Sequence, residues 1–370
     1  MNDDFLNKAM HDCAIEVDYL ANLRKDLSDT EFNNLLTSTL GKYIKNEEIV
    51  FKLISCGTHT WEISIILEMS NESWFSETLL FLTESFRNLM RINKKLAVSI
   101  IERSYPKIHE SLNSWHDAYF LNNVDRKNNQ RHFVRACFRH LGDTVESVHY
   151  PHIECIHELL SNINVLGIPP KNKRGDFGSI ISALIQLDKL KFIYRDNLHD
   201  IPLNQWRNIA QHSSYAINKE SGLIVCVYGN GRHKIEITSD EIYNLLCRLN
   251  DLHSLQKIAL DLFLCEFMDD INFNSNDTII SLETIFGGIL NNINVYGFHL
   301  KSMKNTSGFY QFELVDINES GVKGLNKLLW MIKEQVLLLK EKGIESTFNL
   351  YTKKGDKITS VTIELVNSRM

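Results

Sequence analysis

Residues 200–264 decide the fold, and they read DIPLNQWRNIAQHSSYAINKESGLIVCVYGNGRHKIEITSDEIYNLLCRLNDLHSLQKIALDLFL. This stretch predicts a helix, a tight hairpin and a second helix in direct succession. Asp200 and Pro202 are typical of a helix start, so the first helix should run over LNQWRNIAQHSSYAI. Two runs rich in strand-forming residues, Leu223–Gly229 and Arg232–Thr238, then predict a β-hairpin.

The hairpin turn and the helix after it carry local signals of their own. Asn230 and Gly231 accept the left-handed backbone that a tight turn requires. Thr238 and Glu241 have the spacing of a capping box, in which each side chain bonds the backbone N–H of the other residue. We therefore expect a long helix over EIYNLLCRLNDLHSLQKIALDLFL.

The residues before this stretch extend the helical pattern. RHFVRACFRHLGDTVESVHYPHIECIHELLSNINVL (131–166) predicts one long helix, or two with a kink at Pro151. A loop rich in Pro, Gly and charge follows over Gly167–Asp176, and Asp176 can cap the helix FGSIISALIQLDKL. A helical bundle with an inserted β-hairpin is expected over 125–268.

The chain as a whole is expected to be mainly α. Residues 1–124 read as a helical N-terminal region, with helices over Trp74–Met90 and Ser111–Val124 and an ambiguous strand or short helix, WEISIILEM, at 61–69. Residues 269–370 predict a small α+β domain. There, the hairpin patterns FHLKSM/FYQFELVDI and FNLYTKK/KITSVTIELV flank one amphipathic helix, GLNKLLWMIKEQVLLLKEKG.

Composition limits the function classes. The formal net charge is -6, so any contact with nucleic acid must come from a local patch. The first residues, MNDDFLNKAM, lack the apolar core of a signal peptide, and no apolar run is long enough to span a bilayer. Seven dispersed cysteines without a CxxC pair are typical of a reducing compartment. We expect a cytoplasmic protein.

Arg207 and His212 are the leading candidates for chemistry. Spacing alone does not select them, because similar Arg-His pairs occur at Arg103/His109, Arg126/His132, Arg135/His140 and Arg248/His253. Context does select them, because Asn208 follows Arg207 directly and the hairpin follows His212.

At these residues the sequence resembles the HEPN superfamily, whose signature is an Arg, usually a polar residue next, and a His a few residues on, in a helix of a small bundle. Arg207, Asn208 and His212 match that signature residue by residue, and Tyr215 fits a looser feature of it. The resemblance covers about 126–265. It implies a metal-independent ribonuclease that acts as a homodimer, similar to bacterial toxins and antiphage-defence effectors, with any regulatory partner protein unknown.

The chemistry of the residues agrees with this resemblance. RNA carries its own nucleophile, the 2′-OH, so neither a metal nor a cofactor is required. His212 can move a proton near neutral pH, and the Arg207 guanidinium can bind phosphate as a fork. The alternatives are a catalytically inactive HEPN scaffold and a nucleotide- or RNA-binding module. A purely structural alternative is that Arg207 pairs with a nearby acid such as Asp200.

Three further clusters have weaker signals. Lys127, Arg131, Arg135 and Arg139 recur every four residues, so they form one helical stripe that could follow an RNA backbone or could simply be a solvated face. The loop residues Lys171, Lys173 and Arg174 leave the same two possibilities open. The cluster His149, His152, Cys155 and His157 matches no standard zinc module, so we expect ordinary helix residues there.

Overall fold

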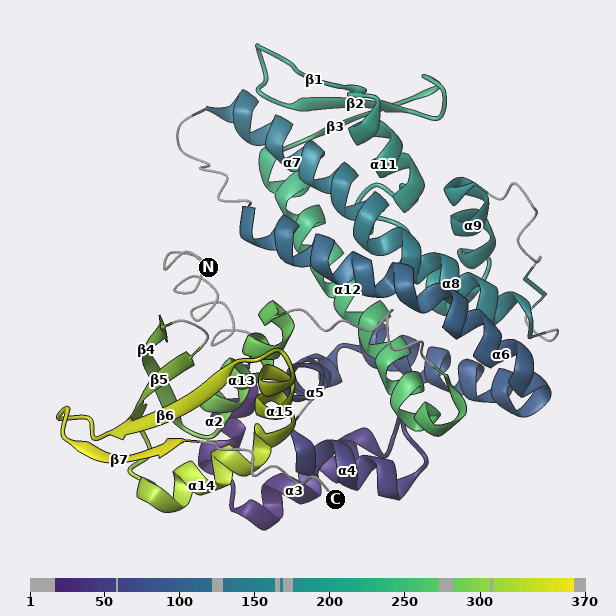
Figure 1. Cartoon of the computed structure of the whole chain (residues 1–370). Coiled ribbons are helices and arrows are strands. Elements are labelled where there is room, and N and C mark those ends of the chain that lie inside the picture. The colour runs from purple at the N-terminus through teal and green to yellow at the C-terminus, as the bar shows by residue number, and fades with distance from the viewer. Residues whose placement is uncertain are drawn as a thin grey trace. The chain divides into compact units, whose positions relative to one another are not determined.

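The computed structural model describes residues 17–57, 59–121, 129–163, 167–168, 176–272, 282–306 and 309–362. These residues are mostly helical, with one sheet of three strands and one of four (Figure 1). The chain forms two compact units. Unit 1 combines residues 1–71 with 279–370, and unit 2 is residues 72–278. Among the described helices, none is both long enough and apolar enough to cross a membrane.

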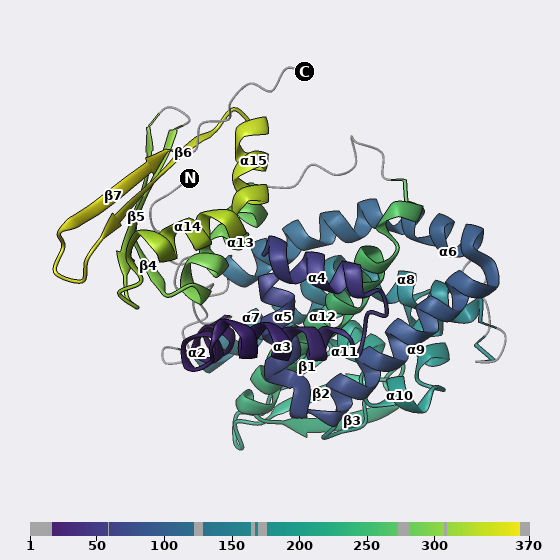
Figure 2. The same cartoon turned by 90° about the horizontal axis from the view of Figure 1, so that it is seen from below.

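Unit 1 brings together an N-terminal and a C-terminal segment of the chain. Its helices are α2 (Asp18–Asp26), α3 (Asp29–Leu40), α4 (Glu47–Cys56), α5 (Thr60–Glu68), α13 (Leu282–Val295), α14 (Gly321–Met331) and α15 (Lys333–Glu341), with a 3-10 turn, η1 (Met69–Asn71). Its strands, in sheet order, are β4 (Phe298–Thr306), β5 (Phe309–Asp316), β6 (Glu345–Tyr351) and β7 (Lys357–Thr362). The middle pair is parallel and the outer pairs are antiparallel. Figure 2 shows α13, α14 and α15 on one side of this sheet.

Hydrogen bonds link the two chain segments of unit 1. The Thr60 hydroxyl donates to Asn292 Oδ1 at 3.1 Å, and Asn292 Nδ2 donates to the Gly57 carbonyl at 2.9 Å. Gly57 has a φ of 61°, and a Cβ there would lie 2.8 Å from Asn292 Oδ1. Only glycine therefore fits this junction without displacing its neighbour.

Unit 2 is a helical bundle with the smaller sheet. Its helices are α6 (Ser73–Leu121), α7 (Gln130–Thr144), α8 (Tyr150–Ser161), α9 (Phe177–Leu184), α10 (Asp188–Lys191), α11 (Leu203–Gln211) and α12 (Ser239–Glu266), with a π-helical turn, η2 (Val145–His149), and a 3-10 turn, η4 (Met268–Asp270). Its antiparallel strands are β1 (Tyr215–Ile217), β2 (Ile224–Tyr228) and β3 (His233–Ile237). Inside α6, the backbone of Asn93 leaves helical geometry, which marks a kink.

The hairpin and the capping signals are confirmed. β2 and β3 pair in register from Ile224↔Ile237 to Tyr228↔His233, and Asn230 and Gly231 between them have positive φ. Both bonds of the Thr238–Glu241 capping box are present at the start of α12. Asp176 caps α9 through the Ser179 N–H, as expected.

Several helix boundaries differ from the expectation. The ambiguous segment 61–69 is helical, with 61–68 in α5 and Met69 in η1. The single helix expected over 324–343 is two helices, because the chain leaves helical geometry at Ile332. Before Pro151 the chain makes the π turn η2, which interrupts the helical ladder where a proline N–H is missing. In unit 1 the two expected hairpins are present as the antiparallel pairs β4–β5 and β6–β7. The chain between β5 and β6 forms α14 and α15, and these two strands pair in parallel.

The packing units do not follow the expected division by sequence order. The segment 72–121, expected in the N-terminal region, belongs to unit 2, and the C-terminal α+β residues share unit 1 with α2–α5. The domain boundaries expected at 124/125 and 268/269 remain a prediction.

Candidate functional site

The short helix α11 positions the candidate residues. Its buried side chains, Leu203, Trp206 and Ile209, recur every three residues and fix one face of the helix in the bundle. Gly142 of α7 allows a close approach, because a Cβ there would lie 3.3 Å from the Ala210 Cβ. Helices α7 and α11 are thus held side by side.

Arg207 is held from two directions. Its Nε donates to Glu146 Oε2 at 2.7 Å, and its Nη1 donates to Asn208 Oδ1 at 3.2 Å. The Arg207 side chain is 28% exposed, so its guanidinium reaches solvent. Asp200, a possible structural partner by sequence, instead pairs with Arg195 at 2.6 Å. Glu146 is the acid that fixes Arg207.

His212 does not lie within the helix, which corrects the expected span of LNQWRNIAQHSSYAI. It is the C-cap residue of α11. The next residue, Ser213, has a φ of 49°, and the Ser214 N–H donates to the Ile209 carbonyl at 2.9 Å. This is a Schellman ending with Ser in the place that Gly usually occupies. His212 is exposed, and its side chain has no hydrogen-bond or ion-pair partner among the described residues.

Tyr215 lies on a strand instead of the candidate helix. It begins β1, and its ring stacks on Phe138 of α7 with centroids 4.0 Å apart. Burial raises the pKa of the Tyr215 hydroxyl, and the positive charge of Arg135 opposes that effect. The Arg207 and Asn208 side chains therefore contact each other directly, whereas His212 is linked to Asn208 through its backbone N–H, which donates to the Asn208 carbonyl at 3.0 Å.

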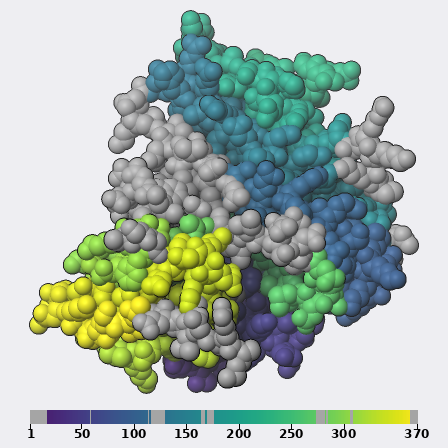
Figure 3. All heavy atoms as spheres, viewed as in Figure 1, coloured from purple at the N-terminus to yellow at the C-terminus, as the bar shows by residue number. Residues whose placement is uncertain are grey.

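The basic stripe lies beside this site. The pairs Phe138–Tyr215, Gly142–Ala210 and Glu146–Arg207 show that α7 runs antiparallel to the α11–β1 segment. Arg131, Arg135 and Arg139 are exposed on α7, and Arg139 meets Asp143 only at 3.6 Å. Lys127 and the loop Lys171, Lys173 and Arg174 lie outside the described residues. Figure 3 shows that α7 and the three-stranded sheet both reach the surface of unit 2.

We expect Arg135→Ala to weaken RNA binding and to reduce its salt dependence by about one charge, without abolishing cleavage. Arg135 has the spacing of a second Arg-His motif with His140, but His140 is half-buried and burial lowers its pKa. Filter binding across a salt series measures the effect. Loss of cleavage in His140→Ala, with His212→Ala still active, would place the chemistry on α7 instead.

The His and Cys cluster is part of the bundle core. His149, His152, Cys155 and His157 are all buried. His149 Nδ1 donates to Gln256 Oε1 at 3.0 Å, and His152 Nδ1 donates to the Val148 carbonyl at 2.9 Å. In the part of the chain that the structure describes, no group of three or more potential ligands is arranged to hold a metal ion.

Glu146 is the site residue that sequence reasoning missed. It lies 61 residues before Arg207 and in the π turn, so no local spacing signals the contact. The kink expected at Pro151 was the only indication that the backbone changes there.

Comparison with known proteins adds no relative: the chain matches no family model, no curated protein and no solved structure. The resemblance to the HEPN superfamily consequently rests on the residues of α11 and their setting.

Proposed function

We propose that this protein is a metal-independent endoribonuclease of the HEPN type, acting in the cytoplasm as a toxin or antiphage-defence effector. The observation that carries the proposal is the arrangement on α11. One arginine is fixed by a carboxylate and an amide, and the same helix ends in an exposed histidine whose side chain has no polar partner among the described residues. The fixed cation suits a phosphate, and the unpaired imidazole suits proton transfer.

In this mechanism the nucleophile is the RNA itself. His212 takes the proton of the 2′-OH, the O2′–P bond forms, and the P–O5′ bond breaks. The leaving 5′ oxygen takes up a proton, so the products carry a 2′,3′-cyclic phosphate and a 5′-OH. Arg207 stabilises the charge that develops on the phosphate, and Asn208 orients the Arg207 guanidinium through its Oδ1.

A second copy of the chain would complete the site. One imidazole can act as base or acid, and cleavage through the 2′-OH benefits from both. We therefore propose a homodimer in which both His212 side chains open onto one groove. Light scattering at micromolar concentration, with and without RNA, measures this. Monomer alone under both conditions contradicts the dimer.

The test of the reaction class uses two substrates in the presence of EDTA. We expect cleavage of an RNA oligonucleotide with cyclic phosphate ends, and no cleavage where a 2′-deoxy nucleotide stands at the scissile position. Cleavage of the deoxy substrate, or strict dependence on a divalent metal, excludes this mechanism.

Arg207→Lys should not restore the activity that Arg207→Ala loses. A lysine keeps the charge, but it cannot bond Glu146 and Asn208 while presenting a planar fork to phosphate. Single-turnover rates at saturating RNA compare the three proteins. Wild-type rates in Arg207→Lys would mean that charge alone suffices.

The second candidate function is a non-catalytic module that binds RNA or a nucleotide. The ion pair of Arg207 with Glu146 favours it, because part of the guanidinium is already occupied. RNA binding that survives in a protein without any cleavage activity would support this candidate over the first.

A further inference from the structure

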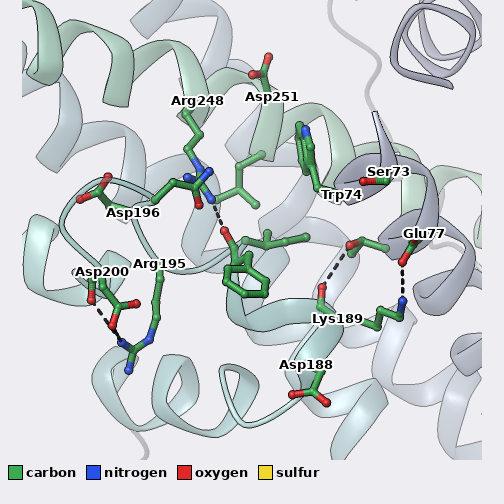
Figure 4. A pocket seen from close by; sticks show the side chains of 15 residues that line it. Ser73, Trp74, Glu77, Asp188, Lys189, Arg195, Asp196, Asp200, Arg248 and Asp251 are labelled. Atoms are coloured by element: carbon green, nitrogen blue, oxygen red, sulfur yellow. Dashed lines mark hydrogen bonds and ion pairs between the residues drawn. The ribbon is translucent and has the colours of Figure 1, made fainter. Parts of the chain in front are cut away.

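A pocket of about 740 Å³ lies in unit 2, and none of its lining residues belongs to α11. It is formed by the start of α6, by α10 with the loop after it, and by the middle of α12 (Figure 4). Pockets of this size commonly hold small organic ligands. Most of its lining residues are polar or charged, and Trp74 and Phe192 are its aromatic residues.

The cations of the pocket already have partners. Lys189 pairs with Glu77 at 2.5 Å, and Arg195 pairs with Asp200 at 2.6 Å; Figure 4 shows both pairs. Arg248 donates to the Phe192 carbonyl oxygen. An anionic ligand would have to displace these oxygens in order to reach a guanidinium or an ammonium group.

Carboxylates are in excess. Five acidic residues line the pocket against three basic ones. The carboxylate of Asp196 accepts the backbone N–H groups of Leu198 and His199, at 3.0 and 2.9 Å, and forms no ion pair within the described residues, although its charge acts on the nearby Arg248 guanidinium. Asp188 has neither a hydrogen bond nor an ion pair from its side chain within the described residues. The pocket therefore attracts positive charge.

The aromatic residues add a second preference for cations. Phe192 is 65% exposed at the pocket, and the Lys191 ammonium lies 5.8 Å from the centroid of its ring. The face of a Trp or Phe ring attracts an ammonium group, while its area covers a hydrocarbon chain. A ligand that combines amines with methylene segments satisfies both kinds of wall.

We infer that this pocket binds an organic polyamine, a flexible chain of methylene groups carrying several ammonium charges. The carboxylates of Asp188 and Asp196 meet the ammonium groups, and Trp74 and Phe192 cover the methylene groups. This inference does not depend on the ribonuclease proposal, because none of these residues belongs to the Arg207 site.

Calorimetric titration of the full chain with spermidine tests the inference. We expect saturable binding, weakened about two- to fivefold in Asp188→Asn, since an exposed charge pair contributes modestly. We expect a larger loss, about fivefold or more, in Trp74→Leu, with partial recovery in Trp74→Phe because the ring is restored. Circular dichroism checks that each variant is folded.

The control variant is Asp26→Asn, which removes an exposed carboxylate from α2 in unit 1. It should bind spermidine as the wild type does. Equal weakening in Asp26→Asn and Asp188→Asn would mean attraction to the acidic surface as a whole, and would overturn the inference. Binding of ATP without binding of spermidine would also overturn the inference. Equal spermidine affinities of Trp74→Leu and Trp74→Phe would overturn it too, because the aromatic ring would then make no difference.

Discussion

Replacing His212 with Ala is expected to lower the rate of RNA cleavage by about 10²–10⁴-fold, the usual contribution of one acid-base group. His212 is the exposed C-cap of α11, so its replacement should disturb little packing. The fold should therefore remain intact and RNA affinity should change little. Single-turnover cleavage in EDTA, together with equilibrium RNA binding, separates the two effects.

His299→Ala is the matched control. His299 is also exposed, but it lies on β4 in unit 1. Its replacement should leave the rate unchanged. Equal activity of His212→Ala and the wild type would remove His212 from the mechanism, and the binding-module candidate would then be the better account of α11.

Lowering the pH from 6.5 to 4 is expected to destabilise unit 2 by roughly 3–5 kcal/mol through His149 and His152. Burial lowers the pKa of each imidazole from 6.5 to about 4. Between these values the unfolded chain binds protons that the folded chain excludes. Stability is thus complete above pH 6.5 and is lost as the pH falls toward 4. The two rings also act on each other, so their effects are not independent.

Urea unfolding at pH 4.5 and 7 measures this, with His149→Gln as the test variant. Glutamine carries no proton at either pH, so the variant should lose less stability on acidification than the wild type. His132→Gln, at an exposed position on α7, should lose as much as the wild type. The same acid sensitivity in all three proteins would show that other groups cause it.

The parts of the fold that the sequence predicted are those fixed by neighbours in the chain. The Asn230-Gly231 turn and the capping box of Thr238 and Glu241 depend on residues within four positions of one another, and both are present. The candidate residues Arg207 and Asn208 are likewise neighbours in the sequence, and their side chains contact each other.

The parts that the sequence did not predict depend on distant contacts or on unusual residues at a familiar position. The partner of Arg207 comes from a π turn 61 residues earlier. The sequence does not predict the end of α11, because the left-handed residue that ends the helix is Ser213, where a Gly is usual. As a result, His212 and Tyr215 were expected on one helix, whereas a helix end and a strand carry them.

Unit 1 is built from an N-terminal and a C-terminal segment, so it cannot fold completely until the ribosome has synthesised unit 2. Asn292 follows Thr60, its hydrogen-bond partner, by 232 residues. At ribosomal rates of about 5–20 residues per second, roughly 10–50 s pass between the synthesis of Thr60 and that of Asn292. During that interval, while unit 2 is being synthesised, α4 and α5 lack their contacts with α14 and α13. We therefore expect nascent chains stalled between residues 72 and 278 to aggregate and to bind chaperones more readily than the complete chain.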